Sequence, residues 1–328
     1  MKTHFNRMFL AIGLYFAFCV SAFAQEQQEA EPGQAAEPAP RAEKPRPASP
    51  KLPPRKNHLF SIAPEVSSYE FKENKLKTNS GTYPGSKVDG TMVGLSVQYQ
   101  GEVLRVRKSV PVQVRARLNY MYGGSLDYED STGYKPSGDV TQRVFDFAFA
   151  IGTEAGLGQD FSIAPYLGYG YRSLTDDEYM ESYNDDVNNI HLESERTHSA
   201  SYLMLGADWK LFPARAWKLS LNTELALLMS GENWIRFDDD EYDMRDKDEY
   251  VYVKQDGGYG LKFALKVERD FGDVRIFAEP FYRYWSIEKS RKERDYFYDR
   301  RTHQEIEYNF QFPKNKTEEF GLRIGVTF

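Results

Sequence analysis

The clearest pattern in the chain is a strict alternation of apolar residues with polar or small ones, and the C-terminal segment 316–328 displays it in full. Its apolar positions are Phe320, Leu322, Ile324, Val326 and Phe328, and the residues between them are Gly321, Arg323, Gly325 and Thr327. A period of two places successive side chains on opposite faces of an extended strand. The segment is therefore predicted to be a β-strand with one apolar face and one face toward polar surroundings.

The segment 110–122 shows the same alternation with charged residues on its polar face. One face carries Val112, Val114, Ala116, Leu118 and Tyr120, and the other carries Gln113, Arg115, Arg117 and Asn119. A helix would spread these charges around its circumference, whereas a strand gathers them on one side. The segment is predicted to be a strand whose charged face points inward in a closed sheet.

Alternating segments recur from residue 58 to the end, and the connections between them are long and short in turn. Further strands are predicted at 59–71, 91–100, 145–152, 163–172, 203–209, 217–225, 259–268 and 274–284. Long polar loops are predicted at 72–90, 173–197, 230–257 and 288–314, and short turns at 156–160, 212–214 and 271–273. About ten strands joined in this way indicate an all-β, antiparallel, up-and-down barrel.

Aromatic residues are placed differently at the two kinds of connection. Tyr120, Tyr122, Tyr169, Tyr171, Tyr282 and Tyr284 are expected near the long loops, and Phe161, Phe212, Trp217, Phe271 and Phe328 near the short turns. Two such girdles are typical of a barrel that crosses a membrane. Together with the terminal phenylalanine, the pattern resembles bacterial outer-membrane β-barrel proteins of omptin-like or porin-like size.

That resemblance implies a transmembrane barrel with long extracellular loops and short periplasmic turns. It also implies that Phe328 acts as an assembly signal for the barrel-assembly machinery, and that outer-membrane lipid and lipopolysaccharide surround the protein.

The N-terminal region is predicted to direct export. Lys2 and Arg7 precede an apolar run that ends at Ala22-Phe23-Ala24, so residues 1–24 are interpreted as a signal peptide that is cleaved before Gln25. The lone Cys19 lies within it. The mature chain is then expected to have no disulfide and no thiolate chemistry.

Residues 25–57 are rich in proline and alanine and contain little apolar bulk, so they are predicted to be a disordered periplasmic tail. The basic second half of this tail is interpreted first as a solvated spacer, with contact to the anionic cell wall or a periplasmic partner as the alternative. The whole chain has 42 basic and 49 acidic residues, and removing Lys2 and Arg7 leaves 40 against 49, a net charge of −9. This acidic balance argues against a nucleic-acid partner.

The inward faces of the predicted strands carry charges of both signs. The predicted lumen network comprises Arg115, Arg117, Asp146, Glu224, Arg275, Glu279, Arg283, Glu319 and Arg323. Charges inside so narrow a barrel persist mainly as ion pairs, which predicts a salt-bridged plug. Small inward residues such as Ala148, Gly168 and Gly170 leave a narrow passage as the alternative.

Enzyme chemistry finds little support in the sequence. The strand number and loops resemble the omptins, outer-membrane proteases whose site opposes two aspartates to an Asp-His pair. Asp127 and Asp130 lie in a further long loop after segment 110–122, where acids are wanted, but the acidic cluster 238–241 in the predicted loop 230–257 has no histidine. Without a base that titrates near neutrality, the mechanism lacks its proton acceptor.

A hydrolase pair and a metal site are the other candidates. His198 with Ser199 or Ser201 is the local Ser-His candidate, but both serines would lie on the opposite face of a strand from it. The acidic clusters 176–178 and 238–241 lack the ligand spacing of a calcium loop and are interpreted as solvated loop charge. No catalytic, cofactor or metal site is predicted.

The expected function is a structural or surface-interaction role through the charged loops, with a narrow pore for small solutes as the alternative and an omptin-like protease as a lesser one.

Overall fold

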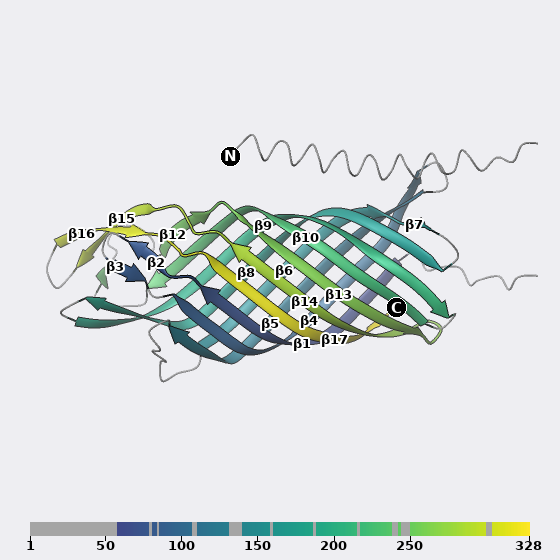
Figure 1. Ribbon diagram of the computed structural model, residues 1–328, viewed down its shortest axis with the longest axis horizontal. Coiled ribbons are helices and arrows are strands. Elements are labelled where there is room, and N and C mark those ends of the chain that lie inside the picture. The colour runs from purple at the N-terminus through teal and green to yellow at the C-terminus, as the bar shows by residue number, and fades with distance from the viewer. Residues whose placement is uncertain are drawn as a thin grey trace, which may run out of the picture. The chain divides into compact units, whose positions relative to one another are not determined.

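The computed structural model describes residues 58–78, 81–83, 85–106, 110–130, 140–157, 160–185, 188–214, 217–237, 242–243, 250–299 and 304–328. Every regular element in these ranges is a β-strand (Figure 1). Within them, no helix has the length and apolarity needed to cross a membrane. The predicted signal peptide and tail, residues 1–57, lie outside the described residues.

Ten antiparallel strands form a closed barrel. They are β1 (His58–Glu73), β4 (Ser86–Val106), β5 (Val110–Asp130), β6 (Val140–Thr153), β8 (Phe161–Asp185), β9 (Asn188–Ala214), β10 (Trp217–Phe237), β13 (Gly258–Asp270), β14 (Arg275–Ile287) and β17 (Asn315–Thr327). Each strand pairs with its neighbours in this order, and β17 pairs with β1. The predicted all-β, antiparallel, up-and-down barrel of about ten strands is confirmed.

The seam between β1 and β17 closes the barrel. Their register runs from Ser61 opposite Thr327 to Glu73 opposite Asn315. Phe60 and Phe328 exchange backbone hydrogen bonds of 3.0 and 2.9 Å just beyond the last pair. The seam therefore leaves the first and last barrel strands no open edge along this length. The barrel end that holds His58 and Phe328 is called the short-turn end, and the opposite end the loop end.

Seven shorter strands occur in addition to the ten strands of the barrel. Two extend its sheet: β7 (Ala155–Gly156) pairs with β8, and β12 (Tyr250–Gln255) pairs with β10. A three-stranded sheet contains β11 (Tyr242–Asp243), β15 (Glu293–Asp299) and β16 (Gln304–Phe310), and a hairpin contains β2 (Leu76–Thr78) and β3 (Gly81–Tyr83). The predicted loops 72–90 and 288–314 thus contain strands of their own.

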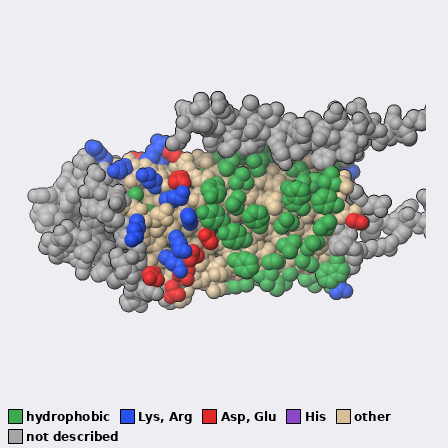
Figure 2. All heavy atoms as spheres, viewed as in Figure 1, with side chains coloured by type: hydrophobic (Ala, Val, Ile, Leu, Met, Phe, Trp, Pro, Cys, Tyr) green, Lys and Arg blue, Asp and Glu red, His purple; other side chains and the backbone are tan. Residues whose placement is uncertain are grey.

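An apolar band surrounds the outside of the barrel. Its exposed side chains include Ile62, Val66, Val93, Leu95, Leu118, Phe147, Phe149, Leu167, Leu221, Leu225, Phe263, Leu265, Ile276, Leu322 and Ile324. On the face drawn in Figure 2, hydrophobic side chains gather in one zone, and most of the Lys, Arg, Asp and Glu side chains lie beyond it. A continuous apolar zone around a closed barrel is the surface that a lipid bilayer requires.

The aromatic girdles only partly match the prediction. Exposed Trp217, Phe271 and Phe328 mark the short-turn end, as expected. Tyr122, however, lies eight residues before the end of β5, so the tyrosines of β5 do not mark the loops. At ~3.3 Å per residue and a tilt of ~40°, β5 continues for roughly 20 Å along the barrel axis past this tyrosine.

Two predicted loops are wrong for the same reason. Most of segment 173–197 belongs to β8 and β9, which have 25 and 27 residues, and β10 continues to Phe237. These strands are far longer than the ~9–11 residues that cross a bilayer. Their polar outer parts resemble a loop in composition, yet neighbouring strands of the barrel continue beside them and supply backbone partners.

Because the backbone hydrogen bonds form one closed ladder, we expect the barrel to resist unfolding by SDS without heat. Unheated protein should migrate differently from boiled protein on an SDS gel. A chain truncated before Asn315 lacks β17, cannot close the seam, and should migrate identically before and after heating. Identical migration of the intact chain under both conditions would contradict a closed barrel.

Candidate functional site

The interior of the barrel is filled by aromatic rings that lie across glycines of the neighbouring strand. Five directly opposed pairs share this arrangement: Tyr166 with Gly206, Tyr202 with Gly170, Trp285 with Gly260, Phe281 with Gly321, and Phe277 with Gly325. A Cβ on any of these glycines would come within 2.9 Å of the opposing ring. The inward glycines therefore accommodate rings, and the passage suggested for Gly168 and Gly170 is occupied by Met204 and Tyr202.

One interior ion-pair cluster joins β1, β14 and β17. Arg323 contacts Glu65 through Nε at 2.5 Å and Glu279 through Nη1 at 2.6 Å. Arg283 binds Glu65 as well, and its Nη2 lies 2.8 Å from Glu319. Glu65 therefore accepts from two guanidinium groups. All five side chains are buried.

The ring of Phe281 lies between the two guanidinium groups of this cluster. Its centroid is 4.5 Å from Cζ of Arg283 and 4.6 Å from Cζ of Arg323. Gly321 supplies the space for this ring on the other strand. The cations are thus held by carboxylates at their edges and by an aromatic face.

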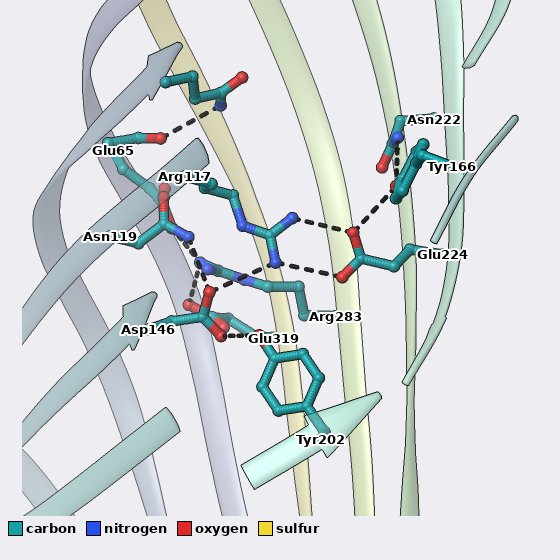
Figure 3. Close-up of polar contacts among 12 residues, drawn as sticks. Glu65, Arg117, Asn119, Asp146, Tyr166, Tyr202, Asn222, Glu224, Arg283 and Glu319 are labelled. Atoms are coloured by element: carbon teal, nitrogen blue, oxygen red, sulfur yellow. Dashed lines mark hydrogen bonds and ion pairs between the residues drawn. The ribbon is translucent and has the colours of Figure 1, made fainter. Parts of the chain in front are cut away.

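A second cluster crosses the lumen. Arg117 on β5 donates from Nη1 and Nη2 to both carboxylate oxygens of Glu224 on β10, at 3.0 and 3.1 Å (Figure 3). β6, β8 and β9 separate these two strands in the barrel. The hydroxyls of Tyr166 and Tyr202 donate to Glu224 and Asp146, each at 3.0 Å. This bidentate pair thus spans the lumen between two strands that are not neighbours.

A small cavity lies beside this bridge. Its volume is about 20 Å³, which is room for about one water molecule. Arg117, Asp146, Glu224, Lys262 and Arg283 contribute its polar lining. The two clusters together hold five carboxylates and three guanidinium groups, and buried Lys262 and Arg172 supply the two further positive charges that balance them.

Toward the short-turn end the pairs are less buried. Arg115 lies 2.5 Å from Asp208, and Lys210 lies 2.8 Å from Glu154. Arg275 lies 3.5 Å from Glu268. With these contacts, the structure places all nine residues of the predicted lumen network inside the barrel and gives each at least one ion pair. Their importance for stability stays a prediction, as does the assembly role of Phe328, whose exposed ring packs 5.6 Å from that of Phe60.

Toward the loop end an apolar layer fills the interior. It consists of Tyr69, Phe71, Val88, Met92, Met121, Leu126, Tyr128, Val140, Val144 and Leu174. Beside it, Arg196 bridges Asp176 and Glu73, each at 2.9 Å. Burial raises the pKa of the Asp176 carboxyl, although Arg196 opposes the shift. The interpretation of Asp176 as solvated loop charge is wrong, because β8 continues past this residue and its side chain faces the interior.

His198 belongs to this interior layer. Its ring lies 5.7 Å from the ring of Phe71 and 5.8 Å from that of Phe312. Burial lowers the pKa of His198 well below its ordinary value, so the imidazole is neutral. Ser199 and Ser201 lie on the outer face, where Tyr169 donates to Ser201 at 2.8 Å. The arrangement provides no Ser-His pair.

The acids that were considered for protease chemistry do not face a common site. Asp127 points outward from β5, directly opposite outward Asp89 of β4. The neighbouring Tyr128 takes the inward position. The side chain of Asp130 and residues 238–241 lie outside the described part of the chain. In the described ranges, no group of three or more metal-ligating side chains is close enough to hold an ion.

Sequence reasoning missed several central residues. Glu65 was not assigned to the lumen, although Ile62 and Val66 face outward on β1 and the intervening odd positions therefore face inward. The same alternation identifies Glu73. The interior position of Arg196 could not be predicted, because segment 173–197 has the composition of a loop.

No family model matches this chain, and no curated protein matches it in sequence. Among solved structures, the fold is similar to that of the outer membrane protease OmpT from Escherichia coli, with a TM-score of 0.54 and 10% identity over 84% of this chain and 97% of that one. Other matches include the transport unit of the autotransporter AIDA-I from Escherichia coli, with a TM-score of 0.32 and 10% identity over 83% and 91% of the two chains. A major outer membrane protein from Thermus thermophilus matches with a TM-score of 0.28 and 14% identity over 81% and 100%. The chain has the β-barrel fold of bacterial outer-membrane proteins.

The Glu65 carboxylate should be the most sensitive interior position. Replacing it in Glu65→Ala leaves Arg283 and Arg323 with one carboxylate fewer in a nearly dry interior, at a cost of about 3–5 kcal/mol. The free energy of unfolding in urea, followed by tryptophan fluorescence, should fall by that amount. Glu279→Ala removes a carboxylate from Arg323 alone, so it should lower the free energy of unfolding by less.

Glu70→Ala is the matched control, because Glu70 lies on the same strand but faces outward and is partly exposed. It should change the free energy of unfolding by less than about 1 kcal/mol. Equal effects of Glu65→Ala and Glu70→Ala would show that the interior is hydrated.

Proposed function

We propose that the protein is an integral barrel of the bacterial outer membrane that acts through its outward surfaces and loops, with a lumen closed to steady ion flow. The apolar band and the shared fold support the location. The predicted signal peptide fits the same address. In this orientation the short turns and the N-terminal tail face the periplasm, and the loop end faces outward.

The single observation that carries the closed lumen is the bidentate Arg117–Glu224 pair across the middle of the barrel. Tyr202, Trp285 and Phe281 lie over glycines at neighbouring positions and occupy the space that a solute would need. The apolar layer of Phe71, Met92 and their neighbours adds a second obstruction toward the loop end.

The outward parts of the protein are then the parts available for recognition. Strands β8, β9 and β10 extend well past the apolar band, so a large polar wall lies among the sugars and ions at the cell surface. Lipopolysaccharide and membrane lipid are the partners expected around the barrel. The barrel-assembly machinery and the cell wall, reached by Phe328 and the basic tail, remain predicted partners.

A pore for small solutes is the alternative that conductance measurements separate most directly. Purified wild-type protein in a planar bilayer should give no steady conductance, because charged and aromatic side chains fill its lumen. Trp285→Ala removes a ring above Gly260 and beside the small cavity, so this variant should conduct more than the wild type. A porin inserted in the same bilayer serves as the positive control. Steady single-channel currents from the wild type would replace the closed-barrel proposal with the pore.

A protease is the other alternative, since the fold is similar to that of OmpT. Protein reconstituted with lipopolysaccharide should hydrolyse dibasic fluorogenic peptides only at the background rate, because Asp127 faces away from the lumen. Asp127→Ala and Asp130→Ala should leave that rate unchanged. Turnover above background that either substitution abolishes would establish an omptin-like mechanism instead.

A further inference from the structure

The wall beyond the apolar band differs in chemistry between its two sides. On the side formed by β17, β1 and β4, the outward residues form two charged rows across the strands. One row consists of the paired Lys316, Lys72 and Lys87, and the next row consists of the paired Glu318, Glu70 and Asp89. Ion pairs link the rows, at 2.6 Å from Lys72 to Glu70 and 2.7 Å from Lys87 to Asp89. This side largely neutralises itself.

The side formed by β8 and β9 carries hydroxyl groups at outward positions. Ser173 is opposite Ser199, and Thr175 is opposite Thr197. These four half-buried side chains define the hydroxyl strip. The Oγ1 atoms of Thr175 and Thr197 lie 3.2 Å apart. The strip offers donors and acceptors without charge.

An aromatic patch adjoins the hydroxyl strip on β10 and β12. It consists of Trp234, Tyr252, Glu232 and Lys254. The register places Trp234 beside Thr197 and Glu232 beside Ser199, so patch and strip form one surface. The rings of Trp234 and Tyr252 pack edge to face with centroids 4.9 Å apart. Trp234 still has 40% of its surface exposed.

The polar members of the patch are arranged around these rings. The Tyr252 hydroxyl donates to Glu232 at 2.7 Å, and Nζ of Lys254 lies 5.7 Å from the centroid of the Tyr252 ring. Desolvation and the bond to Glu232 raise the pKa of Tyr252 to about 12, so its hydroxyl stays neutral. An indole, a phenol, a carboxylate and an ammonium group thus converge on one outward surface.

The height of the patch separates it from the lipid-facing aromatic residues. Trp234 lies five residues beyond Met229, the last exposed apolar side chain that precedes it on β10. At ~3.3 Å per residue and a tilt of ~40°, this is roughly 13 Å farther along the barrel axis. A girdle aromatic residue would lie at the edge of the hydrocarbon instead. Exposed apolar surface at this height marks a contact with something other than lipid chains.

We propose that the aromatic patch and the hydroxyl strip bind a saccharide of the lipopolysaccharide core. The C–H face of a sugar ring packs on an indole, while its hydroxyls exchange hydrogen bonds with serine, threonine and carboxylate groups. The surface faces sideways from the barrel, above the lipid, where the core sugars of the outer leaflet lie. Lys254 suits the acidic and phosphate groups of such a core. This site rests on the proposed outer-membrane location.

The test uses the core oligosaccharide released from lipopolysaccharide by mild acid, with lipid A as a separate ligand. Binding of each to purified full-length protein in detergent is measured by calorimetry. The wild type should bind the oligosaccharide saturably, and Trp234→Ala should weaken that binding about tenfold, while binding of lipid A stays unchanged. Glu232→Gln should weaken it as well, because the carboxylate loses its strength as an acceptor.

Trp217→Ala is the matched control, since Trp217 is 43% exposed but lies at the short-turn end. It should bind the oligosaccharide as the wild type does. Heat-dependent migration shows that each variant is folded, and membrane fractionation and conductance test the proposed function separately. A folded, outer-membrane, non-conducting protein that binds no oligosaccharide would overturn the saccharide site alone. Unchanged oligosaccharide binding by Trp234→Ala, or an equal loss of lipid A binding, would overturn it too.

Discussion

A charged group in the middle of a ten-stranded barrel has almost no water around it, and the rest of the interior depends on that constraint. Such a barrel is barely wider than the side chains it contains. Arg323 is fully buried and makes two carboxylate contacts, and Glu65 accepts from two guanidinium groups. Removing one partner leaves the other charge uncompensated, which costs far more than the pair gains. The interior therefore acts as one network in which each charge fixes the position of its neighbours.

The glycines determine where this network can form. Each of the five opposed pairs places a large ring over a neighbour that has no side chain, and four of the rings then carry a cation on their face. Arg115 lies 4.6 Å from the Tyr166 centroid and Lys266 lies 4.1 Å from that of Phe277. A glycine thus makes room for a ring, the ring supports a cation, and the cation orients a carboxylate. An apolar interior would pack as densely, but strands apolar on both faces would form long apolar runs that resemble membrane helices during export. The polar inward rows avoid this.

Period-two alternation was enough to predict the barrel, its approximate strand number and the inward direction of Arg117, Glu224, Glu279 and Arg323. It could not predict which inward charges meet, because Arg117 and Glu224 are 107 residues apart and lie on strands that are not neighbours. It also failed beyond the apolar band. There both faces of the strands carry polar residues, as around the inward Asp176 and Arg196, so the segment has the composition of a loop while the barrel hydrogen bonds continue. The missing information was the partner strand, which no local pattern contains.

The filled interior and the long polar wall are connected. A barrel that conducts needs a wide lumen and strands just long enough to cross the lipid. In this chain, β8 and β9 have 25 and 27 residues, and paired side chains fill the lumen. The extra strand length adds no membrane contact. It adds outward surface, and the two sides of that surface differ: self-neutralising charge lies on the side of β1 and β4, and uncharged hydroxyls beside Trp234 lie on the side of β9 and β10.

A self-neutralised surface binds weakly and salt-sensitively, because its charges already have partners. The surface beside Trp234 combines uncharged hydroxyls with an exposed indole, so it offers hydrogen-bonding and apolar contacts that depend less on charge. Under the proposed outer-membrane location, the paired interior would hold that wall in register above the lipid, which a loop without strand pairing would not do.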